Sequence, residues 1–348
     1  MIKIRRKTLW LICTFVCILS AGGLYIYHSI TEKYGTFSDK QEEPYYLFID
    51  QDDNIDSVYA KLHVIASEKG MTCFKKLAAK ENYAQSIRTG RYKIEPGKRI
   101  IDVYRQLKFH RQEPLMVTIP ETRTMPRMAA LLSRKIMIDS ATIVSALTDT
   151  AVCASYGYDL QTLPALFIPN TYEVYWDITL EDLLKRMVKE NRHFWNAERM
   201  AKAEAQGLTP VEVCTLASIV DEETANNDEK PMVAGLYLNR LRKGMLLQAD
   251  PTVKFAMQDF SLRRILNKHL TTDSPYNTYK YAGLPPGPIK VASIQGIDAV
   301  LNAAKHDYLY MCAKEDFSGT HNFAVTMREH MHNARRYQQA LNKRGIKG

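Results

Sequence analysis

The sequence predicts an α+β fold, made of an N-terminal transmembrane helix, a small α/β module and a mainly helical second domain with a small β component. An uncharged apolar run covers residues 8–27. Strand-like segments at 45–49 and 90–94 enclose segments with helical spacing. Beyond residue 112 helical patterns dominate, and only 308–312 and 322–325 resemble strands. Helices in long runs, rather than strands alternating with helices, favour an α+β fold.

The composition indicates a globular protein of more than one domain. The chain has 348 residues, of which 46% are hydrophobic and 24% charged. Its formal net charge is +9, but no block of basic residues follows the N-terminus, so we expect no nucleic-acid partner. A mildly basic domain would instead favour anionic envelope polymers or lipid headgroups.

The N-terminal run is long enough to span a membrane. Twenty residues at 1.5 Å each give a helix of about 30 Å, the thickness of a bilayer's hydrocarbon core. The basic start MIKIRRK keeps the N-terminus in the cytoplasm and exports the rest, by the positive-inside rule. A cleaved signal peptide is the alternative, because residues 21–23 are small. The run is longer than a usual signal core, and we therefore predict an uncleaved anchor over residues 1–28.

A polar linker and a compact module follow the anchor. Residues 29–44 lack periodicity and end at a proline. The module, 45–111, has its two strands at 45–49 and 90–94, and its expected helices cover 55–70, 71–82 and 100–110. The second domain, 112–348, has expected helices at 125–135, 140–149, 179–205, 210–224, 230–243, 293–305 and 328–343.

The cysteines do not form a metal or redox motif. Cys13 and Cys17 fall in the apolar run, and the other four are Cys73, Cys153, Cys214 and Cys312. No CxxC pair occurs, which argues against zinc and thioredoxin-like chemistry. For these four cysteines, the sequence is compatible both with disulfide bonds and with buried free thiols.

One helix ends in three consecutive carboxylates. Thr209, Pro210 and Glu212 predict its start, as N-cap, first-turn proline and capping-box partner. At 100° per residue Glu223 lies in the apolar stripe, whereas Asp221 and Glu222 fall on its solvated flanks. A carboxyl against apolar surface has a raised pKa and can serve as a general acid. The alternative is that the helix ends here and Glu223 points into solvent.

Two polar segments downstream could line a site. Asn239 and Arg240 end a helical pattern, and Gln248, Asp250 and Thr252 follow in an Asp-Pro segment that predicts a turn. Tyr276, Asn277 and Tyr279 combine rigid rings with polar groups, which suits sugars but also an ordinary ordered loop. His321, His330 and His332 lack the HExxH pattern, so we expect no metal site.

The segments LASIVDEET, LNRLRKGMLLQADPTVKFA, YNTYKYAGLPPGPI and HNF, in this order, resemble the endolytic murein transglycosylase family (MltG, YceG-like). The resemblance covers essentially the whole chain, and it implies a LysM-like module at 45–111 and a YceG-like catalytic domain at 112–348. It also implies that the functional glutamate is the one directly before Thr224, which is Glu223. Two positions depart from the family pattern: Asp221 and Asn170 stand where family members tend to have glutamate and aspartate.

The resemblance implies a lyase that cuts the MurNAc-β-1,4-GlcNAc bond of nascent peptidoglycan strands and leaves 1,6-anhydroMurNAc ends. Glu223 would act as acid and then base, without metal or organic cofactor. Peptidoglycan synthases are the implied partners, and the bacterial inner membrane, crossed once, is the implied location. The alternatives are a muramidase that hydrolyses the same bond and a membrane-anchored scaffold that binds cell wall. The implied binding residues are Asn239, Arg240, Gln248, Asp250, Thr252, Tyr276, Asn277, Tyr279, His321 and Phe323.

Overall fold

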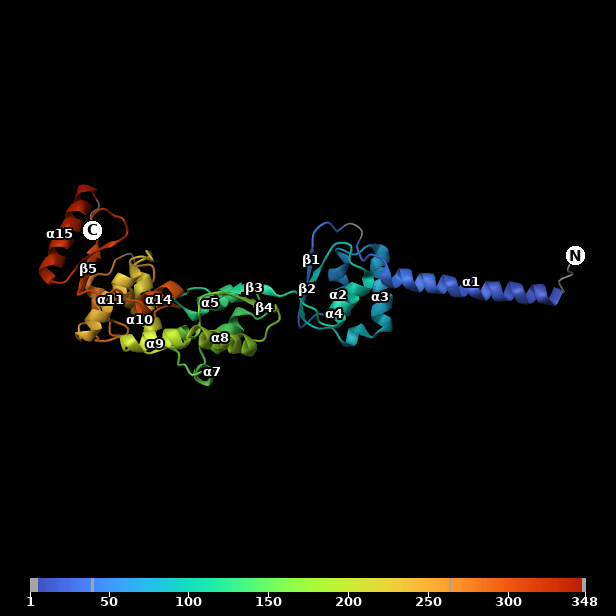
Figure 1. Cartoon of the computed structure of the whole chain (residues 1–348), viewed down its shortest axis with the longest axis horizontal. Coiled ribbons are helices and arrows are strands. Elements are labelled where there is room, and N and C mark those ends of the chain that lie inside the picture. The colour runs from blue at the N-terminus through green and yellow to red at the C-terminus, as the bar shows by residue number, and fades with distance from the viewer. Residues whose placement is uncertain (1–5, 39–40, 263, 346–348) are drawn as a thin grey trace. The chain divides into compact units, whose positions relative to one another are not determined.

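The fold is α+β and mostly helical, as the sequence predicts (Figure 1). The computed structural model describes residues 6–38, 41–262 and 264–345. Within these residues there are three sheets of two strands each, β1 with β2, β3 with β4 and β5 with β6. The chain divides into two compact units, residues 1–116 with 173–178, and residues 117–172 with 179–348. The domain limits given above stay predictions.

The first helix, α1 (Arg6–Tyr34), has 29 residues and contains the whole uncharged apolar run at 8–27. The basic residues Lys3 and Arg5 lie outside the described residues. Searched over its described part, the chain contains no helix with both the length and the apolar character of a membrane span. The anchor stays a prediction.

The first unit packs helices against an antiparallel strand pair. Strand β1 (Tyr45–Ile49) pairs with β2 (Gly90–Ile94), so both predicted strands are confirmed. The predicted boundary between two helices at Gly70 is wrong, because the first helix ends at His63 and the next begins at Glu68. Ser67 caps this next helix by accepting a hydrogen bond from the Gly70 amide at 3.0 Å. The helical elements of this unit are α2 (Ile55–His63), α3 (Glu68–Lys80), η1 (Tyr83–Gln85) and α4 (Ile100–Lys108).

The second unit is a helical assembly with short strands. Its predicted helix 179–205 is two helices, since Asn196 caps the second by accepting from the Arg199 amide at 3.0 Å. The division between the units falls within strands β3 (Leu115–Thr118) and β4 (Thr171–Val174). The other elements of the second unit are α5 (Met125–Leu132), α6 (Ser140–Leu147), α7 (Thr150–Ser155), η2 (Leu163–Leu166), α8 (Leu180–Phe194), α9 (Ala197–Gln206), α10 (Pro210–Glu223), α11 (Lys230–Arg242), α12 (Asp250–Met257), α13 (Asn267–Leu270), α14 (Ile294–Leu301), β5 (Tyr310–Ala313), β6 (His321–Ala324) and α15 (Met327–Lys343).

Helix α10 lies at the centre of the second unit, beside α11 and α14 (Figure 1). Every residue from 213 to 220 is buried. The predicted capping box is confirmed: Thr209 Oγ1 accepts from the Glu212 amide at 3.3 Å, and Glu212 Oε2 accepts from the Thr209 amide at 2.7 Å. The helix also contacts α9, α12 and η2, so neighbours cover it on several sides.

This burial overturns the prediction that Asp221 lies on a solvated flank. The Asp221 side chain is only 2% exposed and forms an ion pair with Lys230 Nζ at 2.8 Å. Its two oxygens also accept from the amide and hydroxyl of Ser293, the N-cap of α14, each at 2.7 Å. Glu222 is 16% exposed and pairs with Arg123 at 2.5 Å. Because neighbours surround α10, projection on a single apolar stripe does not separate exposed from buried positions.

Four cysteines outside the apolar run differ in burial. Cys73, Cys153 and Cys214 are buried, and Cys312 is half-buried. Cys153, Cys214 and Cys312 are free thiols. Burial raises the pKa of the Cys214 thiol to about 12, which keeps it protonated and unreactive.

Replacing Asp221 with asparagine should destabilise the protein. The Lys230 ammonium, whose side chain is 8% exposed, would lose the carboxylate that compensates its charge. Breaking a buried ion pair from one side costs about 3 kcal/mol or more. We expect urea unfolding to show such a loss for Asp221→Asn, and a smaller combined loss for Asp221→Asn with Lys230→Met than the sum of the singles. A loss below 1 kcal/mol for the single variant would contradict this role.

Candidate active site

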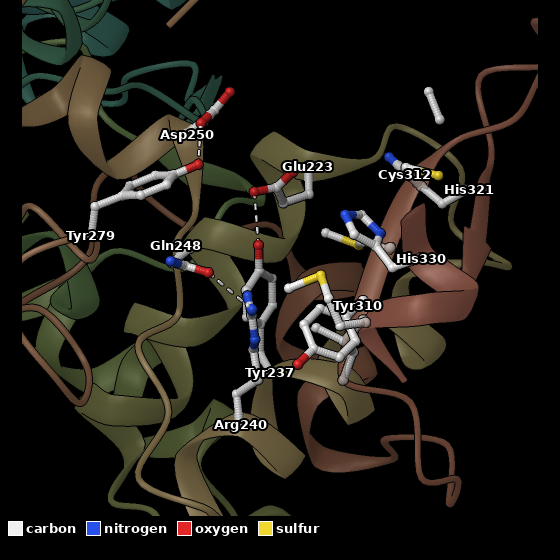
Figure 2. Close-up of a pocket in the computed structure, with 14 residues that line it drawn as sticks. Glu223, Tyr237, Arg240, Gln248, Asp250, Tyr279, Tyr310, Cys312, His321 and His330 are labelled. Carbon is white, nitrogen blue, oxygen red and sulfur yellow. Dashed lines mark hydrogen bonds between the residues drawn. The ribbon is translucent and has the colours of Figure 1, made fainter. Parts of the chain in front are cut away.

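A cavity of about 320 Å³ opens at the C-terminal end of α10, and Glu223 lies on its wall (Figure 2). Helices α10, α11 and α15, the start of α12, strands β5 and β6 and the loop at residue 279 contribute to it. The lining residues are Glu223, Leu236, Tyr237, Arg240, Gln248, Asp250, Tyr279, Tyr310, Met311, Cys312, Ala313, His321, Met327 and His330.

The Glu223 carboxyl is held by one hydrogen bond in a desolvated position. Tyr237 donates its hydroxyl to Glu223 Oε1 at 2.8 Å (Figure 2). Burial raises the pKa of Glu223 to about 7; the Tyr237 hydrogen bond, His321 and Lys254 oppose that rise, and Asp250 adds to it. Near neutral pH this carboxyl can therefore both give and take a proton.

Tyr237 is a site residue that the sequence does not reveal. It is 1% exposed and sits in the apolar stretch Leu236-Tyr237-Leu238, whose pattern indicates core packing only. The pKa of its hydroxyl is raised well above its usual value, by burial first and by the adjacent Glu223. It therefore stays protonated and serves as a hydrogen-bond donor to Glu223.

Five of the ten predicted binding residues line this cavity, namely Arg240, Gln248, Asp250, Tyr279 and His321. Arg240 donates to Gln248 Oε1 at 3.1 Å, and Tyr279 donates to Asp250 Oδ1 at 2.6 Å. The predicted Asp-Pro turn is wrong: Asp250 begins α12, with Pro251 in its first turn, where a proline costs no hydrogen bond. This helix start directs Asp250 to the cavity.

The other five predicted binding residues do not line the cavity but support the segments around it. Asn239 donates to the carbonyl of His306 at 2.7 Å, and Asn277 donates to the carbonyls of Leu270 and Thr272 at 2.9 and 2.8 Å. The remaining three are packed side chains: Thr252 is fully buried against Thr278, with hydroxyls 2.8 Å apart, Tyr276 packs on Phe255 and Phe323 packs on Tyr308. Asn170, the other departure from the family pattern, is absent from the cavity lining.

His321 is oriented by a buried carboxylate. Glu229, 8% exposed, accepts from the His321 backbone amide at 2.6 Å and lies 3.0 Å from His321 Nδ1. With Nδ1 donating to this carboxylate, the orientation of the ring beside the cavity is fixed. Glu229, like Tyr237, is outside the predicted set, since nothing in its local pattern distinguishes it from the other acids of the loop.

Strand β5 and helix α15 supply the remaining wall, which the sequence does not predict. His330 lines the cavity, and its ring stacks on Tyr310 with centroids 5.5 Å apart. Residues a hundred positions beyond Glu223 meet it only through tertiary packing, so local spacing carries no signal for them. Across the described residues, no group of three or more His, Cys, Asp or Glu side chains could hold a metal ion.

Replacing Tyr237 with phenylalanine should raise the pKa of Glu223 further. The hydroxyl stabilises the ionised carboxylate, and a hydrogen bond to a charged group is worth about 1.5–3 kcal/mol. We expect the pKa of Glu223, measured by ¹³C NMR titration, to rise by about one pH unit or more. Tyr279→Phe is the matched control, because that hydroxyl bonds Asp250 instead. An unchanged or lower pKa in Tyr237→Phe would rule out this role.

Replacing Glu223 with glutamine should stabilise the protein at high pH. The folded-state pKa lies above the unfolded value, so between about 4.5 and 7 the unfolded state loses its proton first and stability falls as pH rises. Glutamine does not titrate and avoids this loss. We expect the free energy of unfolding of Glu223→Gln, measured relative to that of the unsubstituted protein, to be about 1–3 kcal/mol larger at pH 8 than at pH 4. A difference independent of pH would contradict the raised pKa.

Comparison with known proteins places the chain in a family. The model of the YceG-like family matches residues 47–336. A protein of Bacillus subtilis named endolytic murein transglycosylase is 29% identical over 306 residues, which are 83% of each chain. A Streptococcus pneumoniae protein of the same name is 26% identical over 332 residues, and the match covers 86% of this chain but 59% of the pneumococcal protein.

A solved structure shares the fold. The crystal structure of a YceG-like protein from Listeria monocytogenes superposes with a TM-score of 0.54 at 26% identity. The match covers 84% of this chain and 99% of that one. The family match extends over well more than half of the 348 residues. The chain therefore belongs to the YceG-like family.

Proposed function

We propose that this protein is a lytic transglycosylase that cleaves the glycan strands of peptidoglycan, at the β-1,4 bond between N-acetylmuramic acid and N-acetylglucosamine. Membership of the YceG-like family supports this, as do the names of the Bacillus and Streptococcus relatives. The observation that carries the proposal is Glu223, whose carboxyl faces a cavity and has a pKa of about 7.

In the proposed reaction, Glu223 starts protonated and gives its proton to the glycosidic oxygen as the C1–O bond breaks. The sugar passes through an oxocarbenium-like state. The Glu223 carboxylate then takes the proton of the muramoyl C6 hydroxyl, whose oxygen bonds to C1 and forms a 1,6-anhydro ring. The proton returns to Glu223 and no water is consumed. A carboxyl whose pKa is close to the working pH suits both steps, and Tyr237 holds it in place.

Hydrolysis of the same bond is the second candidate, and Asp250 is the observation that favours it. A hydrolase uses two carboxyls, one to protonate the leaving group and one to activate water or bond to the sugar. Asp250 lines the same cavity and raises the pKa of Glu223 by its charge. However, Tyr279 donates to Asp250 Oδ1 at 2.6 Å, so this oxygen already has a hydrogen-bond partner other than a water or sugar. The anhydro product is therefore the better-supported outcome.

The location of the protein is part of the proposal. We infer that residues 1–28 anchor it once in the bacterial inner membrane, with the second unit outside the cytoplasm and close to newly made strands. The support is the uncharged run at 8–27 and the exposure of its large apolar side chains, among them Phe15, Ile18 and Leu24 at 63%, 68% and 68%. A LysM-like role for residues 45–111 and cooperation with peptidoglycan synthases belong to the same proposal.

Digestion of purified glycan strands should give anhydro ends. We expect mass spectrometry to find terminal muramic acid lighter by one water than the reducing ends that hydrolysis leaves. Glu223→Gln should lower the rate by about 100-fold or more, because it removes the proton donor. Asp250→Asn should still give anhydro ends.

Three results would point elsewhere. Reducing ends, lost in Asp250→Asn, would establish the muramidase reaction. Unchanged cleavage by Glu223→Gln would show that another residue is the proton donor. Strand binding without cleavage by the unsubstituted protein would favour a scaffold.

A further inference from the structure

Arg240 is a buried cation whose hydrogen bonding is incomplete. It is 8% exposed, and its Nη1 donates to the carbonyl of Leu247 at 2.7 Å. Its Nη2 donates to Gln248 Oε1 at 3.1 Å (Figure 2). Its Nε is buried without a hydrogen-bond partner. Among the residues that the structure describes, no carboxylate forms an ion pair with Arg240, and the two acids of the cavity bond to tyrosines instead.

Such a position is costly unless a ligand completes it. Removing a guanidinium from water without an opposing charge or full hydrogen bonding is strongly unfavourable. Arg240 lines the cavity that contains Glu223, so a group bound there can reach it. A negatively charged or strongly accepting oxygen beside the guanidinium would compensate its charge.

His330 presents a second unsatisfied polar atom on the same wall. Its Nδ1 is buried without a partner, and its ring stacks on Tyr310. The guanidinium of Arg240 lies 5.5 Å from the centre of the same Tyr310 ring. Burial, together with the charge of Arg240, lowers the pKa of His330, so its ring is neutral near pH 7 and one of its nitrogens is a donor.

We propose that Arg240 and His330 form a subsite for an acyl oxygen of the substrate, either a carboxylate or an amide carbonyl. Both side chains then donate to that oxygen. The inference rests on the proposed function: N-acetylmuramic acid differs from N-acetylglucosamine by a lactyl group on O3. This group ends in a carboxylate in a bare strand and in an amide carbonyl where a stem peptide is attached. The subsite would thus recognise the muramoyl sugar and set which bond reaches Glu223.

Binding to chemically altered strands tests the subsite without relying on turnover. Glu223→Gln protein, which leaves strands uncut under the proposed mechanism, is titrated calorimetrically with three probes. These are bare glycan strands, strands whose lactyl carboxyl is reduced to an alcohol, and strands with stem peptides. We expect bare strands to bind about 10- to 100-fold more tightly than reduced strands, as for a hydrogen bond to a charged group.

The same titrations are repeated with Arg240→Gln or His330→Phe added to the Glu223→Gln protein. In either variant we expect the ratio of the affinities for bare and reduced strands to fall towards one. His330→Phe keeps a ring against Tyr310 and alters a residue that is only half-buried, so it tests the subsite even if Arg240→Gln unfolds. His332→Phe is the matched control, because His332 lies on the same helix, is exposed and does not line this cavity. It should keep the full preference.

The outcomes separate the subsite from the reaction. If the affinity for peptide-bearing strands falls equally in the Arg240 and His330 variants, the amide carbonyl is a ligand of the subsite. If that affinity does not change in the variants, the subsite binds the carboxylate only. Equal affinity for bare and reduced strands, or a uniform loss for all probes in the variants, would overturn the subsite. A retained preference in a protein that forms no anhydro ends would overturn the proposed reaction and leave the subsite standing.

Discussion

The geometry of the site around Glu223 depends on how the last turn of α10 is oriented about the helix axis. Asp221 is fixed by Lys230 and by the N-cap of α14, and a side chain on Gly296 would lie 2.5 Å from its Oδ1, so this corner has no room to shift. Two residues further along an α-helix the side chain points about 160° away. Anchoring Asp221 in the core therefore directs Glu223 out of it, towards the cavity and Tyr237.

Helix α11 connects the ion pair of Asp221 with Lys230 to the residues around Glu223. Lys230 and Tyr237 are seven residues apart, two turns, and so share one face, and Arg240 follows one turn later. Lys230 forms the ion pair with Asp221, and Tyr237 donates a hydrogen bond to Glu223. Arg240 lines the cavity that contains Glu223. A single packed interface between α10 and α11 thus sets the stability of the helix end and the geometry of the site together.

The sequence predicts the parts of this arrangement that are local. The capping box at Thr209 and the two separate strands at 45–49 and 90–94 follow local sequence patterns, and they are confirmed. The solvent exposure of Asp221 was mispredicted, because its partner Ser293 lies far along the chain. The segment at Asp250 was mispredicted as a turn, although it begins α12. Half of the predicted binding residues line the cavity, whereas Tyr237, Glu229 and His330 escape prediction, since only tertiary packing gives them polar roles.

The direction of the Glu223 pKa shift follows from an apolar stripe, but its size does not. Burial alone would favour a permanently neutral acid, unable to act as a base. Tyr237, His321 and Lys254 oppose burial, whereas Asp250 reinforces it, and the balance leaves the pKa near 7. These groups come from α11, α12 and β6. A single carboxyl can serve as acid and base in one cycle only near such a balance, so the fold must bring these elements together before the reaction is available.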